Sequence, residues 1–229
     1  MRSITWAKTG LWFFVATTGW WCATTGVTVW AEPLSELHRG SKQITEHKVK
    51  SLVGPSVQVD EQGLVSLAWM EEEKDVRSVL YARSLEPDGP MGAPVRINRP
   101  EDVPYWRQEA PALVVQGEDV FVAWGLAHPK ATPQQPFATE LRLSRSTDSG
   151  KTFQPSVLVN DDPGVIQHTF DALHRDADGR LHLSWIDGRE GKKDPGTYVA
   201  RSLDHGATIN KNLKVDEGTC VCCRTAVTS

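Results

Sequence analysis

The sequence predicts an all-β protein built as an incomplete β-propeller, with about three four-stranded blades and the first strand of a fourth. Three runs of alternating apolar residues each end in tryptophan, at Val65–Trp69, Val120–Trp124 and Leu181–Trp185. They are spaced 55 and 61 residues apart, which indicates an internal repeat. Apolar residues recur at every second position, and glycine and proline separate the runs. This pattern favours strands over helices.

Each tryptophan run is expected to be the second of four strands. A short strand and a tight glycine-containing turn precede it, and two further short strands follow it. A repeat of about 40 to 60 residues with four antiparallel strands is typical of a propeller blade. The expected strands are Ser56–Asp60, Val65–Trp69, Tyr81–Ser84, Val95–Ile97, Ala112–Val115, Val120–Trp124, Leu143–Ser146, Val157–Val159, Asp171–His174, Leu181–Trp185, Val199–Ser202 and Leu213–Val215. The blades are therefore placed at about 54–98, 109–160 and 168–216, and Arg224–Val227 is expected to open a fourth.

Residues 1–31 are predicted to be a signal peptide for export. Arg2 and Lys8 give a positive start, Leu11–Val29 is apolar and rich in threonine and glycine, and small residues stand at −3 and −1 before Glu32. The alternative is an uncleaved membrane anchor, because the apolar stretch is long enough to span a bilayer. Both interpretations place the chain outside the cytoplasm, and the expected location is secreted or periplasmic.

Cleavage is expected after Ala31. A lipoprotein site at Cys22 is disfavoured, because Trp21 stands where a small residue should precede the modified cysteine. Residues 32–53 are mostly polar and are expected to form a linker or an outer strand.

The charge balance excludes one class of partner. Without residues 1–31, 23 basic residues face 29 acidic ones, a formal net charge of −6. A nucleic-acid-binding protein would show a clustered basic excess, so no nucleic-acid partner is expected. The 39% hydrophobic and 24% charged content is too apolar for a disordered chain and too polar for a multi-span membrane protein. No membrane association is expected after signal cleavage.

The turns after two of the third strands carry the most specific motif, S-x-D-x-G-x-T-F. Residues 146–153 match it fully, residues 202–209 match all but the final aromatic, and residues 85–93 keep only the Asp-Gly pair. Aspartate can accept hydrogen bonds from amides of its own turn, and glycine can adopt a positive φ. The matching residues are Ser146, Asp148, Gly150, Thr152, Phe153, Ser202, Asp204, Gly206 and Thr208.

This motif resembles the Asp-box, or bacterial neuraminidase repeat, of the sialidase-like β-propellers. The matching positions extend over about Gly54 to Ser229. In that family the motif is structural, so the resemblance implies a propeller of sialidase type and says nothing about catalysis. Sialidases close six blades, whereas this chain supplies three. The resemblance therefore implies a fragment of a longer protein or, as the alternative, a half-propeller that a second chain completes.

The loops divide between two ends of the predicted blades, because successive strands of a meander alternate in direction. The longer loops follow the second and fourth strands, and long loops on one end of a rigid scaffold usually carry the ligand site. The candidate ligand-binding residues in these loops are Arg107, Asp187, Arg189 and Arg224. The alternative role for the arginines is an ordinary salt bridge to neighbouring acids, and for Asp187 and Arg189 a structural pair that joins two loops.

The resemblance also implies what a working sialidase requires: three arginines for the substrate carboxylate, an aspartate acid/base, and a tyrosine nucleophile activated by a glutamate. The first arginine normally arrives in a Phe/Tyr-Arg-Ile-Pro motif, which is absent from residues 32–60. No catalytic residue is assigned.

Three cysteines within four residues, Cys220, Cys222 and Cys223, are candidates for a disulfide or a metal site. Thiolates bind soft ions such as Cu(I) and Zn(II), whereas an oxidising compartment favours a disulfide. We favour the disulfide, which predicts at most one reactive thiol per chain and no stoichiometric metal. No Cys-x-x-Cys-His motif for covalent haem is present, and no cofactor is predicted.

The sequence thus favours an exported propeller that binds a glycan or a protein partner without catalysis of its own. The alternative is a fragment of an exo-α-sialidase or related glycoside hydrolase, with its remaining catalytic residues beyond Ser229. Whether the chain is an enzyme is left open at this stage.

Overall fold

The computed structural model describes residues 14–15, 21–22, 51–105, 109–191, 195–220 and 223–228. The chain divides into two compact units, Met1–Gln43 and Ile44–Ser229. In the first unit, β1 (Phe14–Val15) pairs with β2 (Trp21–Cys22) in antiparallel orientation. The remainder of the predicted signal peptide and its cleavage site lie outside the described residues, so export stays a prediction.

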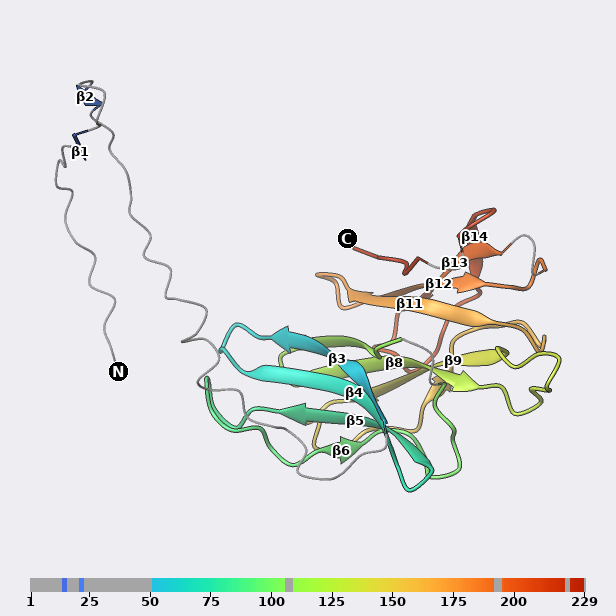
Figure 1. The fold of residues 1–229 in the computed structure, drawn as a ribbon, viewed down its shortest axis with the longest axis horizontal. Coiled ribbons are helices and arrows are strands. Elements are labelled where there is room, and N and C mark those ends of the chain that lie inside the picture. Colours follow the sequence, from blue (N-terminus) through green and yellow to red (C-terminus); the bar gives the residue numbers. More distant parts are fainter. Residues whose placement is uncertain are drawn as a thin grey trace. The chain divides into compact units, whose positions relative to one another are not determined.

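The second unit consists of three four-stranded antiparallel sheets (Figure 1). The first sheet holds β3 (Ser51–Val59), β4 (Val65–Glu73), β5 (Val76–Arg83) and β6 (Val95–Arg96). The second holds β7 (Ala112–Gln116), β8 (Asp119–Ala127), β9 (Thr139–Ser146) and β10 (Val157–Leu158). The third holds β11 (His168–Arg175), β12 (Leu181–Asp187), β13 (Gly196–Ser202) and β14 (Leu213–Asp216).

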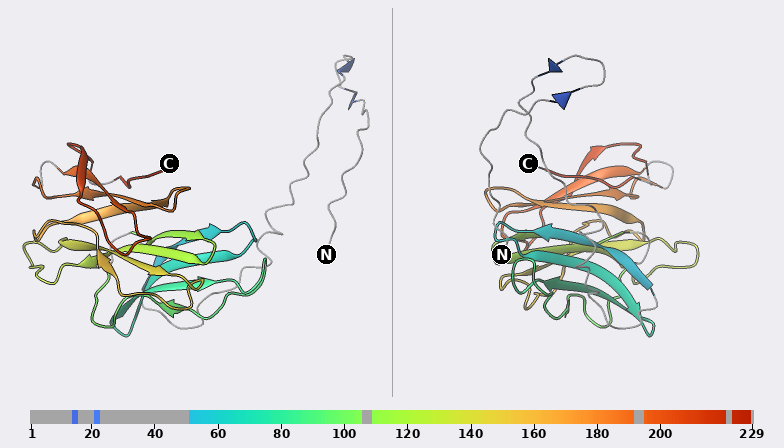
Figure 2. Two further views of the ribbon diagram at one scale, coloured as in Figure 1. Left: turned by 180° about the vertical axis from the view of Figure 1, so that it is seen from behind. Right: turned by 60° about the vertical axis from the view of Figure 1, so that its left-hand side comes forward.

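Within each sheet, the strands are neighbours in chain order. The first strand of each sheet is the inner one, because β3 contacts β7 and β7 contacts β11 (Figures 1 and 2). The described residues form no helix, and so none that could span a membrane. The prediction of an all-β propeller with three four-stranded blades is confirmed.

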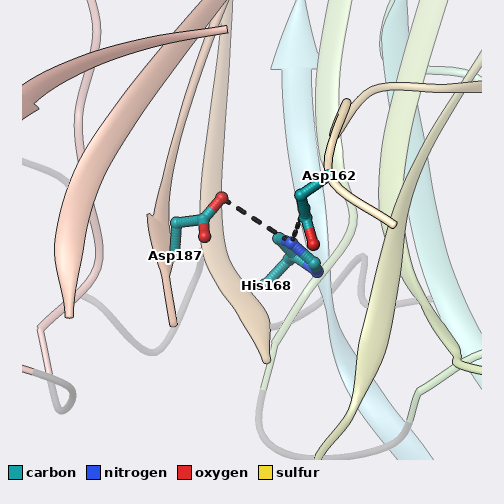
Figure 3. Close-up of side chains that lie close together, drawn as sticks. All are labelled: Asp162, His168 and Asp187. Atoms are coloured by element: carbon teal, nitrogen blue, oxygen red, sulfur yellow. Dashed lines mark hydrogen bonds and ion pairs between the residues drawn. The ribbon is translucent and has the colours of Figure 1, made fainter. Parts of the chain in front are cut away.

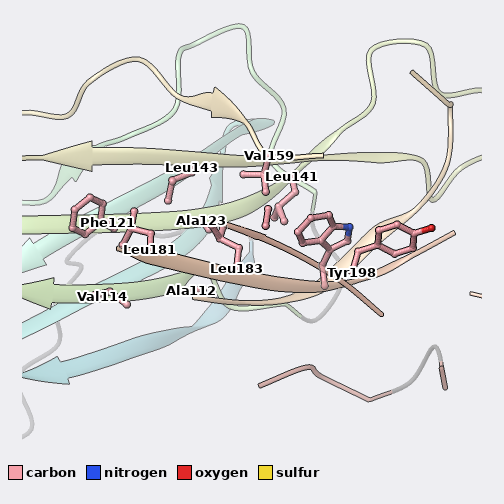
Figure 4. Packing of buried hydrophobic residues seen from close by; sticks show 12 residues of the cluster. Ala112, Val114, Phe121, Ala123, Leu141, Leu143, Val159, Leu181, Leu183 and Tyr198 are labelled. Atoms are coloured by element: carbon pink, nitrogen blue, oxygen red, sulfur yellow. The ribbon is translucent and has the colours of Figure 1, made fainter. Parts of the chain in front are cut away.

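Two of the three repeated tryptophans, Trp124 and Trp185, pack between neighbouring blades. Trp185 is fully buried in the cluster between the second and third blades, where Leu181 and Leu183 of β12 meet Phe121 of β8 (Figure 4). Trp124 lies in the equivalent cluster between the first and second blades. Alternate residues of a strand point to opposite faces, so one strand can supply side chains to two different clusters. The apolar residues at every second position of such a strand therefore pack against the same neighbouring blade.

Three details differ from the expected strands. Residues 71–75 follow the expected second strand Val65–Trp69, where one of the longer loops was expected, but they form a tight hairpin in which Lys74 and Asp75 join β4 to β5. Both residues have positive φ, 49° and 65°, as the two central residues of a type I′ turn require. β3 begins at Ser51, inside the segment expected as linker or outer strand. β11 begins at His168 and contains a bulge between Thr169 and Ala172.

Arginines at the end of the third strands connect one blade to the next. The Arg83 Nη1 donates to the Gly117 carbonyl of the second blade at 3.4 Å. The Arg145 Nη1 donates to the His205 carbonyl of the third blade at 3.0 Å. Arg201 stands in the same register of the third blade and is exposed.

The segment expected to open a fourth blade lies against β11. The Thr225 amide donates to the Phe170 carbonyl at 3.2 Å, and the Thr225 hydroxyl donates to the same carbonyl at 2.7 Å. The Ser184 hydroxyl of β12 donates to Thr225 Oγ1 at 3.0 Å. The residues around Thr225 therefore follow the third blade along its inner strand.

Candidate functional site

The two turns that match the S-x-D-x-G-x-T-F motif use their aspartates internally. Asp148 Oδ1 accepts from the Ser146 hydroxyl at 2.6 Å and the Thr152 amide at 2.9 Å, and Oδ2 accepts from the Thr152 hydroxyl at 2.6 Å. These hydrogen bonds lower the pKa of Asp148 to about 2. Asp204 accepts the equivalent bonds from Ser202 and Thr208, and its pKa is likewise lowered to about 2. Both carboxylates stabilise their own turn.

Asp187 and Arg189, predicted as ligand residues, bind each other at the end of β12. The Arg189 Nε donates to Asp187 Oδ1 at 3.0 Å and its Nη2 donates to Oδ2 at 2.8 Å. The Arg189 amide also donates to Oδ1 at 2.9 Å, and the Trp185 indole N–H donates to Oδ2 at 2.8 Å. The Asp187 side chain is completely buried and its hydrogen-bonding capacity is used.

Two further bonds of Arg189 reach Asp161, at the end of the second blade, and Asn212, which precedes β14 of the third blade. Its Nη1 donates to Asp161 Oδ1 at 2.8 Å, and its Nη2 donates to Asn212 Oδ1 at 3.1 Å. The guanidinium lies 4.2 Å from the centre of the Tyr198 ring. Arg189 therefore joins the second and third blades, as the structural alternative for this residue expects.

His168 adds a third group to this network (Figure 3). Its Nδ1 lies 2.6 Å from the Thr139 carbonyl oxygen, which can only accept, so Nδ1 donates this hydrogen bond. Its Nε2 lies 2.7 Å from Asp162 Oδ2 and 3.6 Å from Asp187 Oδ2. Burial acts to raise the pKa of Asp162, but the hydrogen bond with His168 and other contacts lower it to about 2.

These three side chains present ligand atoms within 4.8 Å of one another, as a metal site would. The Arg189 guanidinium, however, already contacts Asp187 and lies 3.5 Å from Asp162 Oδ2. A metal ion would have to displace these bonds and share the space with a fixed cation. The donor set therefore fits an ion-pair network between blades better than a metal centre.

A second group of ionisable residues lies at the inner strands, and its hydrogen-bonding capacity is not fully used. Glu109 precedes β7, Asp171 lies in β11, and we name these two the axial carboxyls. Glu109 Oε2 accepts from the Phe170 amide at 3.1 Å, and 7% of Glu109 is exposed. Asp171 is 1% exposed, and its Oδ2 has no hydrogen-bond partner among the described residues.

Arg224 approaches the axial carboxyls from the segment that follows the third blade. Its Nε donates to the Asp171 backbone carbonyl at 3.2 Å and its Nη2 donates to the Ala110 carbonyl at 3.0 Å. Its charge also favours ionisation of both carboxyls. Arg224 thus belongs to this group and not to the network of Asp187 and Arg189.

Burial makes the axial carboxyls titrate near neutral pH. Burial and the nearby Asp171 raise the pKa of Glu109 to about 7. Burial raises the pKa of Asp171 to about 6, against the opposing effect of Arg224. Carboxyl groups that interact with each other and have strongly shifted pKa values are typical of functional sites. The pair can therefore both donate and accept a proton or a hydrogen bond near pH 7.

Two predicted residues, Arg107 and Cys222, lie outside the described residues. Cys220 and Cys223 are exposed, and the Cys223 amide lies 3.4 Å from the Cys220 carbonyl. Their disulfide or metal role stays a prediction.

The axial carboxyls were not among the residues predicted from the sequence, although the repeat contains a signal for one of them. Ser56, Ala112 and Ala172 occupy equivalent positions, each paired with the residue before a repeat tryptophan. Proline precedes the first two, whereas Asp171 precedes the third.

A cavity of about 930 Å³ lies at the opposite, short-turn end of the first two blades. It is lined in part by Asp60 and Arg83, which form an ion pair with each other, and by Gly150 and Lys151. The predicted ligand face is the other one, where the long loops lie. This cavity and the axial carboxyls are therefore separate features.

No protein-family model and no curated protein matches this sequence. Among solved structures, the chain resembles a leech intramolecular trans-sialidase with a TM-score of 0.50 and 11% identity, over 84% of this chain and 46% of that one. A PL25 ulvan lyase gives a TM-score of 0.48 with 12% identity, over 70% and 42%. An α-L-arabinofuranosidase from Lactobacillus brevis gives 0.48 with 13% identity, over 72% and 53%.

The chain spans about half the length of each of these proteins. At such low identity the likeness to the trans-sialidase concerns the fold alone. Together with the three four-stranded sheets, it identifies the second unit as three blades of a β-propeller.

Proposed function

We propose that this chain is an exported, sialidase-like Asp-box propeller that binds a glycan at the axial carboxyls. The observation that carries the proposal is the Oδ2 atom of Asp171, a buried acceptor without a partner among the described residues. Leaving a buried polar atom unpaired costs about 1–3 kcal/mol, so such an atom requires an explanation. A sugar hydroxyl would supply the missing donor.

Three further observations support this proposal. Glu109 stands beside Asp171 and retains some exposure, and a second carboxyl suits a ligand with several hydroxyl groups. The solved structures with similar folds are named as a trans-sialidase, a polysaccharide lyase and an arabinofuranosidase. The two motif turns share their hydrogen bonds and place Gly150 and Gly206 at φ of 81° and 79°, which supports the Asp-box assignment.

A glycan array with the full chain tests the proposal. We expect binding to at least one glycan, and we expect Asp171→Asn to weaken that binding at least about tenfold, because a charge-assisted hydrogen bond is lost. Glu118→Gln is the matched control, since Glu118 is an exposed carboxyl at the short-turn end. Circular dichroism should show both variants folded. An array without any bound glycan would refute the proposal.

Glycoside hydrolysis is a second candidate, favoured by one observation. Two carboxyls with pKa values of about 7 and 6 resemble the acid and base pair that such a reaction requires. Under the binding proposal, the chain should not turn over fluorogenic glycosides, sialosides included. Turnover that is lost in Glu109→Gln and retained in Glu118→Gln would establish the enzyme instead.

A further inference from the structure

The segment that carries the cysteines is attached to the third blade on both sides of them. Before them, the Thr219 amide donates to the Pro195 carbonyl at 2.8 Å, and the Thr219 hydroxyl lies 2.9 Å from that of Thr197 in β13. After them, the Thr225 hydroxyl donates to the Phe170 carbonyl of β11 at 2.7 Å. These bonds do not involve the cysteines, so they can persist whether the thiols are reduced or oxidised.

A turn between these two attachments brings two of the cysteines together. The Cys223 amide donates to the Cys220 carbonyl at 3.4 Å, which is the hydrogen bond that closes a four-residue turn. The Cα atoms at the two ends of such a turn lie within about 7 Å of each other. Cysteines joined by a disulfide have Cα atoms about 4.4–6.8 Å apart. The turn therefore holds Cys220 and Cys223 at a separation that is compatible with a disulfide.

The alternatives to this disulfide are less favourable. Cys222 and Cys223 are adjacent, and a bond between them would close a strained ring that distorts the intervening peptide. A structural zinc site takes four ligands. Among the side chains that the structure describes, no group of three metal ligands includes Cys220 or Cys223. The described geometry thus favours the Cys220–Cys223 disulfide.

Exposure and a small ring make this disulfide reactive. Cys220 and Cys223 are both exposed, so a thiol in solution can reach their sulfur atoms. A disulfide that closes a loop of only a few residues removes little entropy from the unfolded chain, so folding adds little to the stability of the bond. Structural disulfides resist reduction by glutathione, whereas exposed ones have higher reduction potentials and are more easily reduced. The Cys220–Cys223 pair has the properties of the second class.

We propose that Cys220 and Cys223 form a thiol–disulfide exchange site that reacts with the thiols or the disulfide of a partner molecule. In the reducing direction, a partner thiolate attacks one sulfur of the disulfide, forms a mixed disulfide and releases the other cysteine as a thiolate. A second partner thiolate attacks the partner sulfur of the mixed disulfide and releases the remaining cysteine. The released thiolates take up the protons that the partner thiols lost.

Two partner thiols and one protein disulfide thus give one partner disulfide and two protein thiols, and the reverse reaction oxidises the site again. This site lies outside the axial carboxyls, and the inference does not depend on glycan binding. Its tests measure only the state of the thiols, so their outcome is independent of any glycan array.

Peptide mapping tests the pairing. Trypsin cleaves after Lys214 and Arg224 and releases all three cysteines of the cluster in one peptide. In protein from an oxidising compartment, alkylated without reduction, we expect Cys222→Ser to retain the disulfide and to show no alkylated thiol in this peptide. Cys220→Ser and Cys223→Ser should each show two. Two alkylated thiols in Cys222→Ser would overturn the pairing.

Glutathione buffers test the exchange, with Cys222→Ser as the protein because it keeps the proposed pair alone. We expect an excess of reduced glutathione to remove most of the disulfide and oxidised glutathione to restore it. Circular dichroism should be the same in both states, because the attachments at Thr219 and Thr225 do not depend on the bond. A disulfide that stays intact in excess reduced glutathione, or a fold that is lost on reduction, would show a structural bond and overturn the proposal.

Discussion

At the scale of single residues, Glu109 shows how burial and a like charge add together. Both disfavour the ionised carboxylate, and the pKa rises from 4.5 to about 7. A carboxyl whose pKa is raised in the folded state stabilises the protein fully only below its unfolded pKa. That contribution is lost as the pH rises through about 7.

Glu109→Gln should therefore stabilise the protein at alkaline pH, because glutamine stays neutral. We expect the free energy of unfolding of the variant, relative to the natural protein, to increase by on the order of 2 kcal/mol between pH 5 and pH 8. Urea unfolding at both pH values measures it. Glu118→Gln should show no such increase, and a pH-independent difference for Glu109→Gln would contradict the assigned shift.

Gly150 illustrates a position where the backbone and a neighbouring ring both require glycine. Its φ is 81°, and a Cβ added there would stand 2.0 Å from Cε1 of Tyr81. We expect Gly150→Ala to lower the free energy of unfolding by about 3 kcal/mol or more, from backbone strain together with the clash. Gly117→Ala is the matched control, because its φ is 63° and no atom lies within 4 Å of the added Cβ. It should cost only about 1–2 kcal/mol, and equal losses for the two variants would rule out the role of Tyr81.

At the scale of elements, Arg189 connects the end of one blade to the second strand of the next. Its partners Asp161 and Asp187 come from different blades, and Asp187 is completely buried. Removing one partner of a buried, hydrogen-bonded charge pair leaves the other unsatisfied.

Arg189→Lys should accordingly lower the free energy of unfolding by about 2–4 kcal/mol, because an ammonium cannot reproduce the paired bonds to Asp187. Denaturant unfolding measures the loss. Arg99→Lys is the control: Arg99 forms exposed ion pairs with Glu101 and Asp102, and such pairs contribute about 1 kcal/mol or less. A loss at Arg189 as small as that at Arg99 would show that the network adds little stability.

The strands could be predicted from the sequence because their signal is local. Alternation and glycine turns around Val65–Trp69 or Leu181–Trp185 need no knowledge of the rest of the chain. The hairpin at Lys74 and Asp75 was missed because neither residue is the glycine usually found at positive φ.

The candidate site could be predicted only in part. Asp187 and Arg189 are close in sequence, and the alternative of a structural pair is the one their contacts favour. Glu109 and Asp171 belong to different blades, and their interaction depends on how the inner strands pack. Burial also sets their pKa values, and burial cannot be read from two isolated acids.

At the scale of the whole molecule, export stays a prediction, because the predicted cleavage site lies outside the described residues. The pattern Val29-Trp30-Ala31 before Glu32 favours cleavage after Ala31. N-terminal sequencing of exported protein should begin at Glu32. Recovery of membrane-bound material that retains Met1 would favour the anchor instead.

The arginines at the ends of the third strands have a consequence for how such a molecule can lengthen. Arg83 and Arg145 each donate to a backbone carbonyl of the following blade, a group that every sequence possesses. Arg201 presents the same donor, exposed, on the third blade. If gene duplication appended a blade, Arg201 could donate to one of its backbone carbonyls without any matching mutation in the new blade. Blades can therefore be added one at a time, because the connecting arginine binds a main-chain carbonyl and not a side chain of the following blade.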